Sequence, residues 1–331
     1  MKKSRSLLLT AIALSGAISL AISIIISFLA PEAAFAAGRS RHAAKSSARN
    51  SAQSSVMNGS APKLAIVNTP AAGVFAKTSE SSERVSEVLL GDEFRVTSLS
   101  RGWACGTIPS QKGYKGCLLA KNLIFPKKDD FFRNSSFLQV KEKRSLLTLA
   151  NGTTLPVNVS TRLPVTGRTG ETFEVLLPDG STGSLQASAC VLEDENFGRH
   201  VAPEDIMNAA AFLGADYKWG GITASGMDCS GFVYTVFRMN GILLKRDSYM
   251  QADEGREIPM SDLQAGDLLF FKSKNGKRIS HVGIYIGYGN FIHASKSMNS
   301  VTISSLDGPF KKNLAAVRRI LKTAKSQELR A

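Results

Sequence analysis

The segment Asp228-Cys229-Ser230-Gly231-Phe232-Val233 places a cysteine between small polar residues, directly before an apolar pattern with helical spacing. The pattern ends at Gly241, a residue typical of helix C-termini, so it predicts a helix over 230–240. At the start of a helix, unpaired backbone N–H groups and the macrodipole favour a thiolate and a developing oxyanion. Cys229 is therefore a candidate nucleophile; the alternatives are a buried small side chain or half of a disulfide.

A cysteine nucleophile needs a base, and two of the four histidines lie in predicted strands late in the chain. Alternation puts His281 on the strand face opposite its apolar neighbours. The 287–290 segment predicts a hairpin that returns His293 on the adjacent strand, where it can orient His281. Each histidine is alternatively an ordinary sheet residue. A zinc site of Cys229, His281 and His293 is a further alternative, but their spacing matches no short metal motif and no fourth ligand is evident, so we expect no metal.

The pattern of short strands and helices divides residues 63–322 into three predicted domains. Residues 63–126 and 135–195 each carry short β-rich runs separated by Gly- and Ser-containing turns, which predicts two small barrels, the second a divergent copy of the first. In residues 201–322 a helix is predicted over 203–213, the nucleophile helix follows, and strands come last. The expected fold is therefore multidomain, with two small all-β domains ahead of an α+β domain.

The N-terminus has the features of a secretory signal peptide. Residues 1–36 combine a basic start, a long apolar run and small residues that predict cleavage after Ala36; an uncleaved membrane anchor is the alternative. Residues 37–62 predict a flexible basic linker, and residues 323–331 a C-terminal tail. The formal charge is +14. Export to the periplasm, envelope or exterior argues against a nucleic-acid partner and favours contact of the linker with an anionic envelope.

Residues 201–322 resemble the NlpC-type domain, a family of papain-like cell-wall cysteine peptidases. The resemblance rests on five segments in the family's order: Tyr217-Lys218-Trp219-Gly220-Gly221, Asp228 to Val233, Leu263 to Phe271, Ser280 to Gly287, and Ile292 to Ala294. It implies that Cys229 is the nucleophile, His281 the general base and His293 the third polar member. It also implies that Tyr217 lies near the thiolate and that no cofactor is used.

The arrangement of two SH3-like domains ahead of such a domain is similar to the γ-D-glutamyl-L-diamino acid endopeptidases, also called dipeptidyl-peptidase VI-like enzymes. This narrower resemblance rests on residues 81–91 and 113–116. It implies peptidoglycan peptides with a free N-terminal L-Ala as substrates, cut between D-Glu and the diamino acid. The residues implied in holding the L-Ala amine or lining its pocket are Glu83, Tyr114, Asp228, Ser230, Asp247 and Ser248. A buried ammonium needs such partners, although Glu83 is alternatively a solvent-facing charge.

The chain departs from this pattern at Cys117, where the first barrel of the family usually has a tryptophan. Cys105 lies on the preceding predicted strand, so the two cysteines are candidates for a disulfide across a hairpin. That pairing leaves Cys229 free and Cys190 without a partner. Pairing of Cys190 with Cys229 would instead abolish the proposed chemistry.

Two other functions compete with peptidase activity. One is a non-catalytic wall-binding protein, which the complete set of Cys229, His281 and His293 argues against. The other keeps the fold and the thiol but acts as an amidase or acyl transferase.

Overall fold

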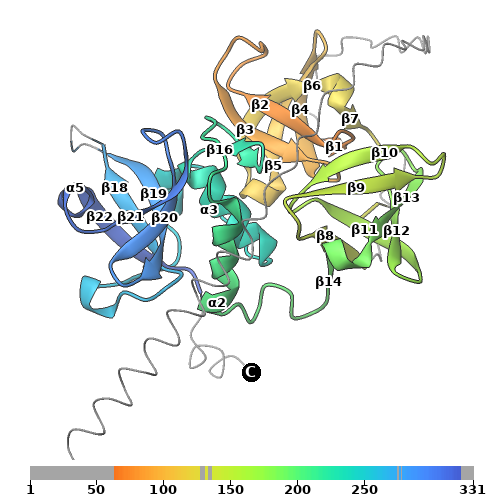
Figure 1. Cartoon of the computed structure of the whole chain (residues 1–331). Helices are drawn as coiled ribbons and strands as arrows, with labels where there is room; N and C mark the ends of the chain where they lie inside the picture. Colours follow the sequence, from red (N-terminus) through yellow and green to blue (C-terminus); the bar gives the residue numbers. More distant parts are fainter. Residues whose placement is uncertain (1–62, 127–130, 133–135, 274–275, 277, 322–331) are drawn as a thin grey trace, which may run out of the picture. The chain divides into compact units, whose positions relative to one another are not determined.

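The structure is a computed structural model that describes residues 63–126, 131–132, 136–273, 276 and 278–321 (Figure 1). The predicted signal segment, basic linker and C-terminal tail lie outside these residues. Within the described part of the chain, no helix is both long and apolar enough to cross a membrane.

The first β domain is a seven-stranded antiparallel sheet with the strand order β3-β2-β6-β5-β4-β1-β7. Along β5 burial alternates strictly, which sends Ala104 and Ile108 into the core, as a sheet with one covered face requires. Its strands are β1 (Lys63–Val67), β2 (Ala71–Phe75), β3 (Arg84–Leu89), β4 (Glu93–Ser100), β5 (Trp103–Ile108), β6 (Tyr114–Leu119) and β7 (Leu123–Ile124).

The second β domain repeats this plan with the order β10-β9-β13-β12-β11-β8-β14, which is the first order shifted by seven strands. The shared order agrees with the prediction that the second domain is a copy of the first. Among the described residues no pairing joins the edge strands of either sheet, so closure into barrels is not seen and the SH3 likeness stays a prediction. The strands are β8 (Phe137–Val140), β9 (Arg144–Leu149), β10 (Thr154–Asn158), β11 (Arg162–Thr169), β12 (Thr172–Leu176), β13 (Thr182–Gln186) and β14 (Cys190–Glu193).

The third domain is built on a six-stranded antiparallel sheet with the order β17-β22-β18-β19-β20-β21. Two of its strands, β17 (Arg256–Glu257) and β21 (Ser300–Ser305), were not predicted from the sequence. The others are β18 (Leu268–Lys272), β19 (Ile279–Gly287), β20 (Asn290–Ser295) and β22 (Leu314–Arg319), and a separate two-stranded sheet is formed by β15 (Ile222–Thr223) and β16 (Gly226–Met227).

The helices of this domain are short except for the nucleophile helix α3 (Cys229–Met239), one residue displaced from the prediction. The predicted helix over 203–213 is instead a single α-helical turn, α2 (Pro203–Ile206), followed by a 3₁₀ segment, η4 (Met207–Phe212). The remaining helices are α4 (Ser248–Gln251) and α5 (Pro309–Asn313).

Helix α3 is buried along its length, from Cys229 to Arg238. Its apolar residues share one core with the face of the sheet that carries Phe270, Val282 and Ile284. The opposite face packs Leu269, Phe271 and Phe291 near Phe310 of α5. Because both faces are covered, β18 is buried at four consecutive positions.

A buried ion pair joins α3 to the first β domain. Arg238 donates to Asp92 through Nη2 at 2.6 Å and Nη1 at 3.2 Å, and both side chains are buried. Tyr234, one turn earlier, donates to the backbone carbonyl of Ser110 at 3.2 Å. Two polar residues of this largely apolar helix, Tyr234 and Arg238, thus face the first β domain.

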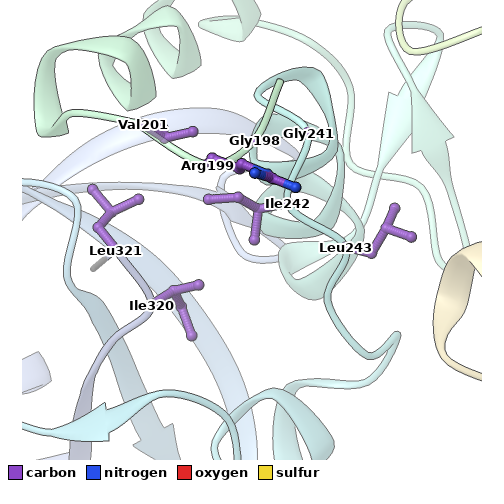
Figure 2. Close-up of a pocket in the computed structure, with 8 residues that line it drawn as sticks. All are labelled: Gly198, Arg199, Val201, Gly241, Ile242, Leu243, Ile320 and Leu321. Atoms are coloured by element: carbon purple, nitrogen blue, oxygen red, sulfur yellow. The ribbon is translucent and has the colours of Figure 1, made fainter. Parts of the chain in front are cut away.

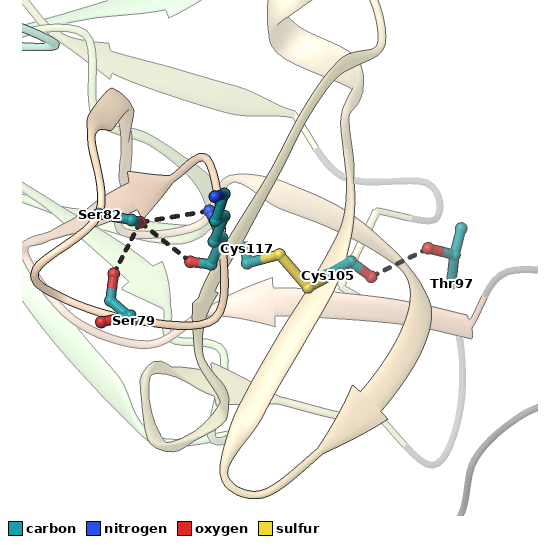
Figure 3. The surroundings of a disulfide bond; sticks show 6 residues. Ser79, Ser82, Thr97, Cys105 and Cys117 are labelled. Atoms are coloured by element: carbon teal, nitrogen blue, oxygen red, sulfur yellow. Dashed lines mark hydrogen bonds between the residues drawn. A yellow bond between two sulfur atoms is a disulfide. The ribbon is translucent and has the colours of Figure 1, made fainter.

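A disulfide joins Cys105 of β5 to Cys117 of β6, which are direct cross-strand partners (Figure 3). It lies at the base of the hairpin that ends in the 3₁₀ turn η1 (Pro109–Gln111) and returns at Tyr114. Among the described residues, Cys190 and Cys229 are free and buried.

We expect Asp92→Asn to destabilise the protein by about 3 kcal/mol, because it leaves the buried Arg238 guanidinium without a counter-charge. The melting temperature measured by calorimetry should fall by about 6 °C or more. Glu257→Gln is the matched control, since Glu257 is 75% exposed in its pair with Arg318 and its loss should change stability by less than about 0.5 kcal/mol. Equal shifts in the two variants would contradict the assignment.

Candidate active site

Cys229 is the first residue of α3, and Asp228 is its N-cap. Oδ1 of Asp228 accepts from the backbone N–H of Gly231 at 2.7 Å, which satisfies one of the unpaired donors of the first turn. Gly231 has no Cβ because one would lie 2.0 Å from the carbonyl oxygen of Gly221. The quoted segment is therefore a capped helix start pressed against the loop that precedes it.

The Cys229 thiol is 7% exposed, and this burial sets its acidity. Burial, followed by the negative charge of Asp228, raises the pKa of Cys229 to about 12. The backbone N–H groups of Val282 and Ser230 and the charge of Arg246 oppose this shift but do not overcome it. The sequence predicted a thiolate favoured by the helix start, whereas in this structure desolvation outweighs the helix terminus and the resting thiol is neutral.

The two predicted histidines are in contact. Nε2 of His281 and Nδ1 of His293 are 2.8 Å apart, and Nε2 of His293 lies 3.0 Å from Oγ of Ser304 on β21. Burial lowers the pKa of His281 to about 4, and burial together with His281 lowers that of His293 to about 3. Both imidazoles are therefore neutral at pH 7.

This chain of contacts fixes how a proton can be accepted. Because Nε2 of His281 is occupied by His293, Nδ1 of His281 is the nitrogen left to take a proton. His281 then donates from Nε2 to His293, and His293 donates from its own Nε2 to Ser304. Ser304 was not predicted because its strand was missed; an alternating polar run at 300–305 was the available signal.

The Cys229 sulfur meets the histidine strand at the amide next to His281. The N–H of Val282 bonds to the thiol. The register of β19 with β20 begins at Ile284, so the Val282 amide lies outside that ladder. The structure thus brings the nucleophile to β19 beside the predicted base.

Arg246 is a second residue of the site that sequence reasoning missed. It is buried and donates to both carboxylate oxygens of Asp228, at 3.0 and 2.7 Å, and to Oγ of Ser230 at 3.0 Å. Its Nε donates to Oγ of Ser86 in the first β domain at 3.0 Å. Burial alone would lower the pKa of Arg246, but the charge and hydrogen bonds of Asp228 raise it. A buried acidic N-cap requires a cation, but the burial of Asp228, and with it the need for Arg246, is visible only in the structure.

These contacts change the interpretation of Asp228 and Ser230. Both oxygens of Asp228 already accept from protein donors, including the backbone N–H of Gly220 at 2.8 Å. Both residues hold the helix start and Arg246, and this saturates the carboxylate that was predicted to help bind a substrate amine.

A second acidic group, Asp247, is half-buried. Tyr114 of the first β domain donates to its two oxygens, each at 3.1 Å, and Tyr249 also bonds to it. Burial raises the pKa of Asp247, which Arg246 and Tyr114 only partly offset. Ser248 follows it as the first residue of α4. The structure therefore brings Tyr114 into contact with Asp247, which Ser248 follows in the chain, and their role in one substrate pocket stays a prediction.

Glu83 takes a different place. Its Oε1 accepts from the indole N–H of Trp219 at 2.9 Å, and no hydrogen bond in the described part of the chain joins it to Tyr114. Tyr217 lies two residues before Trp219, and burial together with the charges of Cys229 and Asp228 raises its pKa. Tyr217 is thus near the thiol, as predicted. Glu83 instead contacts Trp219, which lies in the same loop, residues 217–221.

A pocket of about 240 Å³ lies elsewhere in the third domain (Figure 2). It shares no lining residue with the site described above, being lined by Gly198, Arg199, Val201, Gly241, Ile242, Leu243, Ile320 and Leu321. In the described ranges there is also no group of three or more His, Cys, Asp and Glu side chains arranged to hold a metal ion.

Comparison with known proteins agrees with this geometry. Residues 214–319 match the NlpC/P60 family model. A γ-D-glutamyl-L-lysine dipeptidyl-peptidase of Bacillus subtilis is 33% identical over 243 residues, which cover 71% of this chain and 80% of that protein. The chain belongs to the NlpC/P60 family. The family assignment made from the five sequence segments is thereby confirmed.

Two further NlpC/P60 relatives cover different shares of the chain. The murein DD-endopeptidase MepS/murein LD-carboxypeptidase of Escherichia coli is 44% identical over 144 residues, 42% of this chain and 74% of that protein. The crystal structure of an NlpC/P60 family protein from Bacillus cereus superposes with a TM-score of 0.73 at 26% identity, covering 78% of this chain and all of that one. The likeness to the Bacillus structure extends beyond the third domain.

The raised pKa of Cys229 predicts how its alkylation depends on pH. Because only the thiolate reacts, the rate with iodoacetamide should rise about tenfold per pH unit between pH 6 and 9. Peptide mapping by mass spectrometry separates Cys229 from the other free cysteine, Cys190, and Cys229→Ser supplies the blank. A rate that stays constant over this range would mean that a thiolate is already present at pH 6.

Proposed function

We propose that the protein is an exported cysteine peptidase that cleaves the γ-D-glutamyl–diamino acid bond of peptidoglycan peptides with a free N-terminal L-Ala. The observation that carries the proposal is the Asp247 carboxylate, held by Tyr114 from another domain and adjacent in sequence to Arg246, which braces the nucleophile helix. The names of the similar proteins, a dipeptidyl-peptidase and a murein endopeptidase, support the same substrate class.

In the proposed reaction, Cys229 and His281 are both neutral before the substrate is attacked. Charging Cys229 or His281 alone is disfavoured by burial, but moving the proton from sulfur to Nδ1 of His281 creates two opposite charges that stabilise each other. Sulfur attacks the γ-carbonyl carbon, and the C–N bond breaks as His281 returns the proton to the leaving amine. Water, deprotonated by His281, then hydrolyses the thioester and releases L-Ala-D-Glu and the thiol.

The oxyanion formed in each step requires donors. The backbone N–H of Ser230 at the start of α3 bonds to the Cys229 thiol, and the phenol of Tyr217 stays protonated because its pKa is raised. Tyr217 is therefore available as a neutral donor at the reacting carbonyl.

The amine pocket follows from Asp247. An ammonium beside this carboxylate offsets the cost of burying it, while the Tyr114 hydroxyl orients the carboxylate. A substrate whose amine is blocked cannot supply this ammonium to Asp247, which makes a free N-terminus part of the recognition.

The reaction is tested with the synthetic peptide L-Ala-γ-D-Glu-diaminopimelate and mass spectrometry of the products. The intact protein should release the dipeptide L-Ala-D-Glu, and Cys229→Ala should lower the rate at least about a thousandfold because the attacking atom is gone. Cys190→Ala, which removes the other free cysteine, should keep its activity. Absence of the dipeptide from the intact protein, or its release by Cys229→Ala, would reject the proposal.

The amine pocket is tested by acetylating the N-terminus of the same peptide. Loss of the ammonium should lower kcat/KM by about 30- to 100-fold, since a buried carboxylate loses its partner. Asp247→Asn should reduce the difference in kcat/KM between the free and the acetylated peptide. Asp253→Asn, at an exposed position, should leave this difference unchanged. Equal cleavage of both peptides by the intact protein would remove Asp247 from amine recognition.

A further inference from the structure

Trp219 is an exposed aromatic side chain that is nevertheless held in place. It is 54% exposed, yet its ring N–H donates to Glu83 at 2.9 Å and its backbone carbonyl accepts from Arg84 at 2.6 and 3.1 Å. The glycine that follows allows this approach, because a Cβ on Gly220 would lie 2.5 Å from the carbonyl oxygen of Arg84. An indole fixed at its edge and backbone presents a rigid open face.

The ammonium group of Lys296 lies over the Trp219 ring. The residue lies in the turn between β20 and β21, is exposed, and places Nζ 5.7 Å from the centre of the Trp219 ring. The turn is joined to the loop by the N–H of Tyr217, which donates to the carbonyl of Asn299 at 3.0 Å. A cation over an indole is attracted by the ring but keeps its charge available to an anion.

Lys296 differs from the other cations around residues 217–221 in its ion-pair partners. Of the cations that contact residues 217–221 in the described part of the chain, three already have acidic partners: Arg84 and Lys218 pair with Glu87, and Arg246 pairs with Asp228. Within the same described ranges Lys296 has no carboxylate within ion-pair distance. One positive charge at the loop is therefore uncommitted.

The position of this charge relates it to the reaction. Trp219 is two residues from Tyr217, which interacts with Cys229, and Lys296 is three residues beyond His293 on the same strand and turn. The Lys296–Trp219 pair therefore lies on the two segments that carry His293 and Tyr217.

We propose that Lys296, held over Trp219, binds a carboxylate of the substrate peptide and makes the protein select for peptides that carry it. The inference rests on the proposed function for the identity of the peptide. Besides the C-terminal carboxylate, which the diaminopimelate and lysine peptides share, that peptide offers two carboxylates near the scissile bond: the α-carboxylate that γ-linked D-Glu retains, and the second carboxylate of diaminopimelate, which lysine lacks.

Binding to Cys229→Ala, which cannot turn the peptide over, tests this without relying on activity. Three peptides are titrated by calorimetry: L-Ala-γ-D-Glu-diaminopimelate, the same peptide with lysine in third place, and the lysine peptide with the D-Glu α-carboxylate amidated. The diaminopimelate peptide should bind about five- to tenfold more tightly than a peptide that lacks the carboxylate bound by Lys296. The ratio of the two dissociation constants should shrink as the salt concentration is raised.

Adding Lys296→Met to the Cys229→Ala variant should reduce this ratio of dissociation constants to about one, whereas adding Lys296→Arg should retain it. Loss of the ratio between the first two peptides assigns the diaminopimelate carboxylate, and loss between the last two assigns that of D-Glu. Lys121→Met, an exposed lysine of the first β domain, is the matched control and should change neither ratio.

Ratios that Lys296→Met leaves unchanged, or peptides that do not bind, would overturn the inference. Failure of the proposed function is a separate result, namely binding by Cys229→Ala without release of the dipeptide by the intact protein.

Discussion

The buried guanidinium of Arg246 is the constraint on which the site depends. Removing such a group from water is costly, and the cost is offset only by a complete set of acceptors: both oxygens of Asp228, the hydroxyls of Ser86 and Ser230, and the carbonyl of Gly221. Those acceptors come from the helix cap, the nucleophile helix, the preceding loop and the first β domain. The nucleophile is therefore positioned by an ion that two domains share.

Burial also explains why Cys229 and His281 are uncharged at neutral pH. The same low dielectric that raises the pKa of Cys229 and lowers that of His281 strengthens the attraction between a thiolate and an imidazolium once the proton has moved. His293 and Ser304 fix which nitrogen of His281 accepts the proton. Under the proposed reaction, the two groups are unreactive at rest and become charged together when the proton moves.

The two β domains have the same strand order but different roles toward the third domain. The first contributes a carboxylate to Arg238, a hydroxyl to Arg246 and the phenol of Tyr114. The second reaches α3 through Gln139, whose amide donates to the carbonyl of Arg238 at 3.1 Å. The Cys105–Cys117 disulfide lies in the first domain only, at the base of the hairpin that delivers Tyr114.

The sequence alone determined the family, the nucleophile helix, the pairing of His281 with His293 on adjacent strands and the repetition of the β domains, because each is encoded by local spacing and turn residues. Only the tertiary structure decided the state of the thiol, the saturation of Asp228, the central place of Arg246 and the partner of Glu83. These depend on which distant groups share a buried volume. Desolvation and ion pairing are set by that volume rather than by neighbours along the chain, so no local pattern could reveal them.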